Sequence, residues 1–154
     1  MTAGTLALAD EAATIALGRA LAGLLRAGDA VALAGPLGAG KTMLARGVLT
    51  ALGLEGEAPS PSFPIVIAYT PPDVRIPLLH VDLYRIEARH ELDELGLDDA
   101  RCDAALLIEW PERMGAALWP DALRLTLEPG DDGGRRLTWA APAAWETRWP
   151  PAFP

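Results

Sequence analysis

One pattern in the sequence has residue types and spacing that could bind phosphate. Gly35 to Thr42 matches G-x-x-x-x-G-K-[ST] along its whole length. It follows an apolar run, Ala30 to Ala34, that predicts a buried strand, and it precedes a predicted helix from Lys41 to Leu52. There, glycine-rich backbone can turn successive N–H groups inward and, with the positive end of the helix, surround phosphate oxygens. A chance glycine-rich turn before Lys and Thr is the alternative, and the flanking strand and helix argue against it. The pattern predicts a nucleotide-binding loop lined by Leu37, Gly38, Ala39, Gly40, Lys41 and Thr42.

Lys41 and Thr42 would carry the chemistry of this loop. Lys41 is the only lysine among 13 Lys and Arg residues. A compact, flexible ammonium group reaches between two phosphates more easily than a planar guanidinium group does. We therefore expect Lys41 to bind the β- and γ-phosphates of ATP, and the Thr42 hydroxyl to take one Mg²⁺ position.

Glu109 is the first candidate for the carboxylate that such a loop needs to organise Mg²⁺. It closes the apolar run from Ala104 to Ile108, and this order is typical of a Walker B strand. A carboxylate there would lie at the carboxyl edge of the sheet, where ligands of open α/β sheets bind. The alternative is a strand-end acid exposed to solvent.

Asp82 is the second candidate, and it lies in a predicted strand from Leu78 to Tyr84. Period-two alternation places His80, Asp82 and Tyr84 on one face of that strand and aliphatic residues on the other. A local ion pair between Asp82 and Arg85 is the alternative to a role in catalysis.

The remaining patterns predict an α/β fold. A strand from Thr5 to Leu8 precedes a helix capped by Asp10, and the C-terminal part of the chain reads as two strands around a glycine-rich loop. The further elements expected are strands over 65–69, 104–108, 123–127 and 135–140 and a short helix near 90–95. Together they predict a P-loop NTPase-like mixed sheet flanked by helices, with a C-terminal β-hairpin.

We expect residues 1–141 to form a single P-loop ATPase domain, and residues 142–154 a Pro- and Trp-rich tail. Tryptophans that pack the tail back on the sheet are one interpretation of its composition, and a partner-docking patch is the other. The lone Cys102 is expected to be a small core residue, because it has no partner for an internal disulfide. A net charge of −8 argues against unaided binding to nucleic acid. The absence of a signal peptide and of a long apolar run predicts a cytoplasmic protein that does not bind membranes.

Several short motifs, in this order and spacing, resemble the bacterial TsaE-type ATPases that take part in making threonylcarbamoyladenosine in tRNA. The similarity runs over most of the chain. The matching segments are Leu37–Thr42 with Arg46-Gly47 and Leu52-Gly53, Ser60–Phe63, His80–Arg85, Glu91-Leu92 with Leu95-Gly96, and Ile108–Glu112. Two positions depart from the family pattern: Met43 replaces a second Thr, and Ser62 replaces a Thr but keeps its hydroxyl.

The resemblance implies a site and a task. Thr42 and Glu109 would bind Mg²⁺, and Asp82 would lie near the metal ion and the attacking water. The Ser60–Phe63 segment, and Ser62 within it, would respond to the bound nucleotide. Glu11 and Thr14 match the family's first helix and would border the adenine of ATP or ADP.

The resemblance also implies partners: a threonylcarbamoyl-transferase subunit and its non-catalytic paralogue, which ATP hydrolysis would reset between turnovers. tRNA would be contacted only indirectly. An arginine finger contributes about 10³–10⁵ in rate, so a small P-loop protein without one should be slow until a partner acts on it. Arg46, Arg85 and Arg113 are the candidate internal sources, and a solvated surface charge is the favoured interpretation of each.

Two other functions share this pattern. A small-metabolite P-loop kinase has similar size and layout, and its lid would have to be the short loop from Asp131 to Arg136. A non-catalytic nucleotide-dependent switch would order Ser60–Phe63 around ATP, with hydrolysis incidental.

Overall fold

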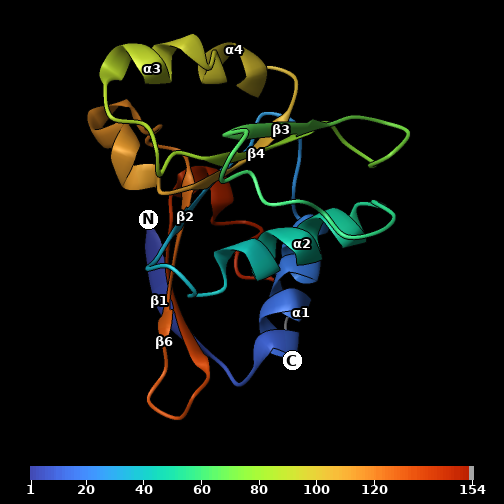
Figure 1. Ribbon diagram of the computed structural model, residues 1–154. Coiled ribbons are helices and arrows are strands. Elements are labelled where there is room, and N and C mark those ends of the chain that lie inside the picture. The colour runs from blue at the N-terminus through green and yellow to red at the C-terminus, as the bar shows by residue number, and fades with distance from the viewer. Residues whose placement is uncertain (153–154) are drawn as a thin grey trace.

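A seven-stranded mixed sheet organises the chain in the computed structural model, which describes residues 1–152 (Figure 1). Its spatial order is β1-β7-β6-β2-β5-β4-β3. The strands are β1 (Thr2–Leu8), β2 (Ala30–Ala34), β3 (Val66–Tyr69), β4 (Leu78–Asp82), β5 (Ala105–Glu109), β6 (Leu123–Pro129) and β7 (Arg135–Ala141). The predicted α/β fold is confirmed.

The centre of the sheet is parallel and its two margins are antiparallel. β2 pairs in parallel with β5 and β6, and β4 pairs in parallel with β5. β6 and β7 form the predicted C-terminal hairpin, β1 adds to it, and β3 lies antiparallel to β4. The carboxyl ends of β2, β4 and β5 therefore meet at one edge, where the sequence predicts the site.

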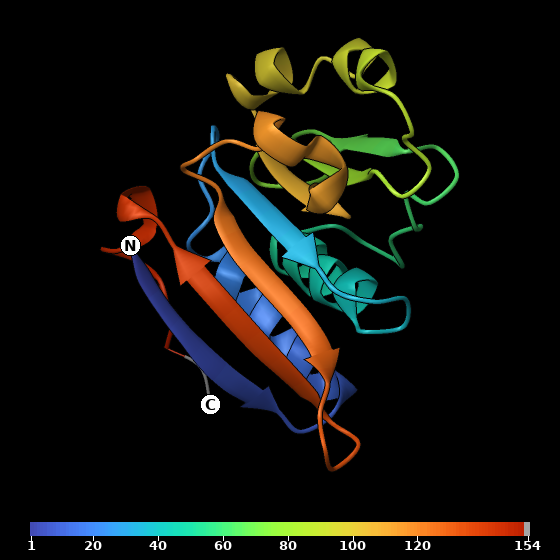
Figure 2. The same ribbon diagram turned by 90° about the vertical axis from the view of Figure 1, so that its left-hand side faces the viewer.

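Two helices, α1 (Glu11–Ala22) and α2 (Lys41–Ala51), cover one face of the sheet (Figure 2). They cross closely, because a Cβ atom placed on Gly47 of α2 would lie 2.4 Å from the Ile15 carbonyl oxygen of α1. Their buried leucines share the main core with inward-facing residues of β2 and β5 to β7.

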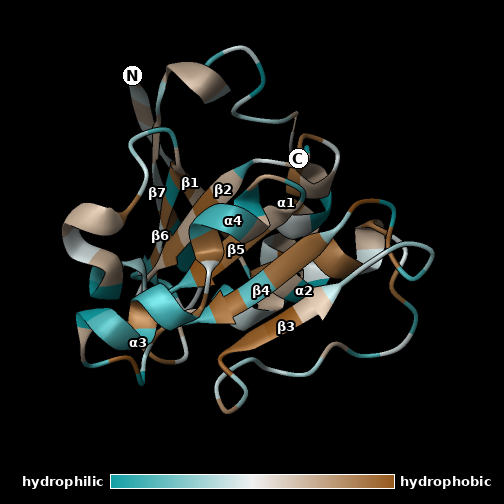
Figure 3. Ribbon diagram, turned by 90° about the horizontal axis from the view of Figure 1, so that it is seen from above, coloured by the Kyte–Doolittle hydropathy of each residue, from teal (hydrophilic) through white to brown (hydrophobic). Residues whose placement is uncertain are grey.

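The opposite face carries shorter helices. They are α3 (Arg89–Glu94), α4 (Leu97–Arg101) and the 3₁₀ segment η1 (Pro111–Ala117). A second core lies beneath them and includes Val81 and Leu83 together with Leu106 and Ile108. Figure 3 shows the contrast between the hydrophobic strand β4 and the more hydrophilic α3 and α4. No helix among residues 1–152 has the length and apolar character needed to cross a membrane.

The alternation predicted for the fourth strand holds as far as Asp82. Val81 packs in the second core, while His80 and Asp82 lie on the side of the main core and are buried. β4 ends at Asp82, so the prediction was wrong for Tyr84, which lies past the strand and is 45% exposed. The Asp82 carboxylate accepts a hydrogen bond from the Tyr84 backbone N–H at 2.9 Å, and this turn replaces the next strand position.

The segment after β7 packs against the sheet as far as the structure describes it. Trp145, in the 3₁₀ turn η2 (Ala143–Trp145), is 1% exposed, and Trp149 is 4% exposed; both belong to the main core. The packing interpretation of these tryptophans is confirmed. Residues 153 and 154, at the end of the predicted tail, lie outside the described residues.

Cys102 is exposed, so its expected place in the core was wrong. It caps the C-terminal end of α4, whose buried contact is made by Leu97 instead. α4 and both 3₁₀ segments were not predicted, because three to seven residues are too few for an apolar period to show.

Candidate active site

The predicted phosphate-binding loop joins β2 to α2 directly. Gly40 occupies the N-cap position of α2 with a φ of 104°, which an L-side chain rarely adopts, so the loop can turn into the helix there. The first N–H groups of α2 have no partner within the helix, and the positive end of the helix dipole lies at the same place. This arrangement favours an anion.

Lys41, the first residue of α2, is 5% exposed. Its Nζ donates a hydrogen bond to the Gly35 carbonyl oxygen at 2.7 Å and lies 3.6 Å from the centroid of the Trp110 ring. Burial lowers the pKa of Lys41 from its usual 10.5, and the negative charges of Glu109, Glu112 and Asp82 oppose that shift. The lysine is thus held inside the loop, within a negative field.

The two predicted carboxylates lie side by side, because Asp82 and Glu109 are register partners at the ends of the parallel strands β4 and β5. Asp82 is 5% exposed and Glu109 is 3% exposed. The Asp82 carboxylate accepts a hydrogen bond from the Ser62 hydroxyl at 3.2 Å. Glu109 Oε2 lies 2.6 Å from Nε2 of His80. A solvent-exposed Glu109 was therefore the wrong alternative.

The alternative for Asp82, an ion pair with Arg85, is absent from the ion pairs of residues 1–152. Arg85 instead donates a hydrogen bond to the Phe63 carbonyl oxygen at 3.3 Å, and its guanidinium group lies 5.1 Å from the Phe63 ring centroid. Asp82 consequently remains available to the site.

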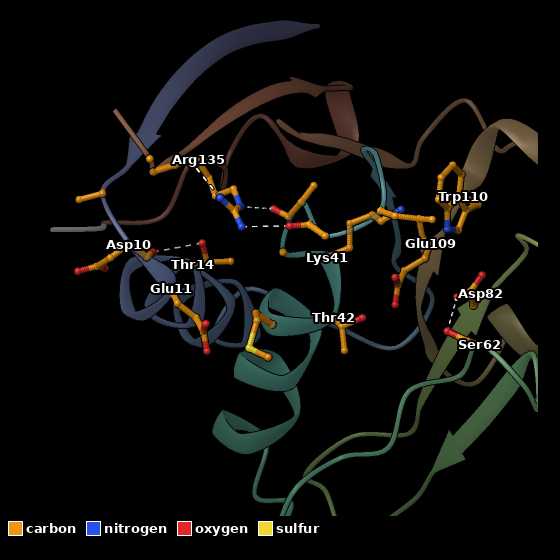
Figure 4. Close-up of a pocket in the computed structure, with 18 residues that line it drawn as sticks. Asp10, Glu11, Thr14, Lys41, Thr42, Ser62, Asp82, Glu109, Trp110 and Arg135 are labelled. Atoms are coloured by element: carbon orange, nitrogen blue, oxygen red, sulfur yellow. Dashed lines mark hydrogen bonds between the residues drawn. The ribbon is translucent and has the colours of Figure 1, made fainter. Parts of the chain in front are cut away.

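A cavity of about 590 Å³ collects the predicted site residues (Figure 4). Its size falls in the ordinary range for small-molecule sites. The predicted residues that line it are Glu11, Thr14, Leu37, Gly38, Ala39, Gly40, Lys41, Thr42, Ser62, Asp82 and Glu109. The structure brings the whole predicted set to one place, while the role of each residue stays a prediction.

The cavity has two chemically different ends, with Lys41 and Thr42 between them (Figure 4). Glu109, Asp82 and Ser62 lie at one end, and the start of α1 lies at the other. At the α1 end, the Asp10 carboxylate accepts a hydrogen bond from the Ala13 N–H at 2.8 Å, and this N-cap fixes where Glu11 and Thr14 stand.

Arg135 is a cavity residue that the site prediction missed. Its Nε donates to the Ala39 carbonyl oxygen at 2.9 Å and its Nη2 to the Gly38 carbonyl oxygen at 3.0 Å. It therefore holds two carbonyl groups of the phosphate-binding loop from outside. The partners are almost a hundred residues apart in sequence, so no local pattern could have indicated them. Trp110 was missed as well, although its place directly after Glu109 was a signal.

The three arginines considered as internal fingers do not line this cavity. Arg46 pairs with Glu57, Arg85 lies over Phe63, and the Arg113 guanidinium lies 5.7 Å from the Tyr84 ring centroid. None of these three arginines therefore places its guanidinium group at the carboxylate end of the cavity.

Comparison with known proteins bears on this site. The family model described as "Threonylcarbamoyl adenosine biosynthesis protein TsaE" matches residues 8–137, which include every predicted site residue. This chain belongs to the TsaE family.

Relatives of this family member agree with that assignment. It is 44% identical over 113 residues to a tRNA threonylcarbamoyladenosine biosynthesis protein TsaE from Streptomyces coelicolor, covering 73% of this chain and 76% of the relative. A TsaE from Mycobacterium tuberculosis is 38% identical over 89% of this chain and 86% of its own length. The crystal structure of YdiB from Bacillus subtilis has a TM-score of 0.80 and 26% identity, covering 95% of this chain and 90% of the other.

Proposed function

We propose that this TsaE-family chain is a Mg²⁺-dependent ATPase of tRNA threonylcarbamoyladenosine biosynthesis. The observation that carries the proposal is the register of β4 and β5, which sets Asp82 beside Glu109 in the cavity that also holds Lys41 and Thr42. A phosphate-binding loop without such carboxylates would bind a nucleotide without organising its metal ion. Because this pathway modifies tRNA, we also expect the protein to work in the cytoplasm.

The residues present fit a magnesium ion. Mg²⁺ prefers oxygen ligands, keeps several waters and is usually held by one or two carboxylates together with substrate phosphates. The Thr42 hydroxyl and the Glu109 carboxylate are such ligands, with Asp82 close to them. Residues 1–152 contain no group of three or more His, Cys, Asp or Glu placed to hold a metal ion alone. A magnesium ion would thus enter with the nucleotide, whose charge it would neutralise.

Each remaining residue has a task that its position allows. Lys41 would contact the β- and γ-phosphates, because it is buried at the start of α2. Asp82, whose carboxylate is already fixed by Ser62 and by the Tyr84 N–H, would orient the attacking water. Glu11 and Thr14 would border the base, since they lie at the opposite end of the cavity from the carboxylates (Figure 4).

The position of Arg135 in the cavity supports a partner-dependent ATPase. It lies close to Gly40 and at the α1 end of the cavity, away from Glu109 and Asp82 (Figure 4). None of the arginines among residues 1–152 is seen at the carboxylate end of the cavity lining. We therefore propose that turnover is slow alone and is stimulated by the threonylcarbamoyl-transferase subunit and its non-catalytic paralogue, which hydrolysis would reset.

The kinase alternative loses the feature that favoured it. Its lid was to be the loop that ends in Arg135 and Arg136. Arg135 is engaged with the phosphate-binding loop, and Arg136 pairs with Glu128 of the neighbouring strand at 2.7 Å. Neither guanidinium is left to close over a second substrate.

Phosphate release from ATP and Mg²⁺, measured with and without the two partner subunits, tests the proposal. We expect stimulation only when both are present, and transfer of phosphate to a metabolite would contradict the ATPase. Release that never exceeds the background, with binding intact, would favour the switch.

Two substitutions assign the roles within that assay. Glu109→Ala should weaken Mg²⁺-dependent nucleotide binding, and Asp82→Ala should slow turnover more than binding. Glu94→Ala, an exposed acid on α3, is the matched control and should change neither. If Asp82→Ala hydrolyses ATP at the normal rate in the full assembly, the water-orienting role is wrong.

A further inference from the structure

His80 does not line the cavity, but its side chain contacts Glu109, which does. It occupies the middle of β4 and is 1% exposed. In the sheet its register partner is Leu107, two residues before Glu109 on the adjacent strand, so the two side chains meet diagonally on one face. The result is the 2.6 Å contact between His80 Nε2 and Glu109 Oε2. One carboxylate oxygen of Glu109 is thereby committed to the protein.

The second ring nitrogen of His80 indicates which partner donates. Nδ1 is buried without a hydrogen-bond partner. A buried N–H with no acceptor, particularly on a charged ring, costs more than a buried lone pair with no donor. The unpartnered Nδ1 therefore favours the arrangement in which His80 carries a hydrogen on Nε2 and donates it to the Glu109 carboxylate.

The contact between His80 and Glu109 matters because Lys41 could otherwise pair with Glu109. Lys41 and Glu109 are oppositely charged, both are buried, and both line the same cavity. Attraction between such charges is strong where water is scarce. Yet the ion pairs within residues 1–152 do not join them. Lys41 is held by the Gly35 carbonyl and Trp110, and Glu109 is held by His80.

We infer that His80 is a positioning residue that keeps Glu109 directed to the Mg²⁺ position and prevents it from pairing with Lys41. The inference rests on the proposed role of Glu109 as a Mg²⁺ ligand. Hydrogen bonds to the ligands of a metal commonly change metal affinity by about 10- to 100-fold when they are removed. Loss of His80 should therefore weaken the contribution of Mg²⁺ to nucleotide binding by a factor in that range.

The quantity to measure is the Mg²⁺ increment, defined as the ratio of the ADP dissociation constants without and with Mg²⁺. His80→Leu, which fills the site without a donor, should reduce the increment at least tenfold. His80→Gln can place its amide N–H near the original Nε2 and should restore most of it. His80→Asn is too short to reach and should behave like His80→Leu.

Thermal unfolding of the same variants separates positioning from stability. A purely structural role would lower the unfolding temperature of His80→Leu and leave the increment of the folded protein intact, and that result would overturn the inference. Equal increments for His80→Gln and His80→Asn would overturn it as well. If His80→Leu does not fold, the comparison of the Gln and Asn variants decides.

Glu109→Gln distinguishes failure of this inference from failure of the proposed function. Loss of the increment in Glu109→Gln but not in His80→Leu would refute only the positioning role. An unchanged increment in Glu109→Gln would refute the metal role of Glu109, and the inference with it. If His80 acts through Glu109, the double variant His80→Leu/Glu109→Gln should lose no more than Glu109→Gln alone.

Discussion

Trp145 gives the sharpest test of how the chain is built, because it lies in the segment that was predicted to be a tail. Its indole is 1% exposed and packs in the main core. The Arg148 guanidinium lies 3.9 Å from its ring centroid and binds both Asp29 oxygens, at 2.6 and 2.7 Å. Trp145→Ala would therefore empty a core position and uncover a partly buried ion pair.

The expected cost is large but measurable. Truncating a buried Trp to Ala costs about 3–5 kcal/mol, and a domain of this kind has a total stability of about 5–15 kcal/mol. At about 2–4 °C per kcal/mol for a chain of this size, the unfolding temperature should fall by roughly 6–20 °C. Circular dichroism during heating measures this shift. Thr147→Ala, at an exposed position in the same turn, is the control and should change stability by less than about 0.5 kcal/mol.

Removal of residues 142–154 should destabilise the protein further. That deletion would also take away Trp149, which is 4% exposed, and the loss of a second buried tryptophan costs about another 3–5 kcal/mol. The combined loss approaches the whole stability of the domain, so a chain that ends at residue 141 should not fold. A core role for this segment is wrong if Trp145→Ala and Thr147→Ala unfold at the same temperature, or if the shortened chain unfolds cooperatively like the full one.

Three further predictions concern the nucleotide site. Lys41→Arg should lose ATP binding, because the bulkier guanidinium group does not fit between the Gly35 carbonyl and Trp110. Equilibrium ATP binding, measured on a variant whose unfolding temperature is unchanged, checks this, and wild-type affinity would contradict it. Glu112→Gln removes a charge that opposes the lowering of the Lys41 pKa, so that pKa should fall further. Amine-selective labelling of the single lysine should then reach half its maximal rate at lower pH, and an unshifted profile would mean that Glu112 does not act on Lys41. Arg135→Ala should weaken ATP binding about tenfold, equivalent to roughly 1.4 kcal/mol, because two loop carbonyls lose their donors. Arg135→Lys keeps the charge without the paired donors, so wild-type ATP affinity in this variant would contradict the role of the two hydrogen bonds.

The elements near the phosphate-binding loop were predictable because their signals are local. A five-residue apolar run made β2, a glycine-to-lysine step began α2, and Asp10 capped α1 as expected. Alternation along β4 predicted which residues share a face, and it failed at Tyr84 because a backbone turn ends the strand. The missed elements, α4 and the two 3₁₀ segments, are too short to show a full apolar period. That period is the signal that predicted the longer helices.

The sequence by itself predicted the chemistry of the site: a phosphate-binding loop, one lysine, one hydroxyl and two acids on strands. Each of these signals comes from neighbouring residues, which backbone geometry ties together. Only the tertiary structure decided that His80 holds Glu109, that Arg135 holds the loop and that Trp145 belongs to the core. Those contacts join residues from separate strands and turns, and they exist because sheet register and core packing bring together segments that share no local pattern.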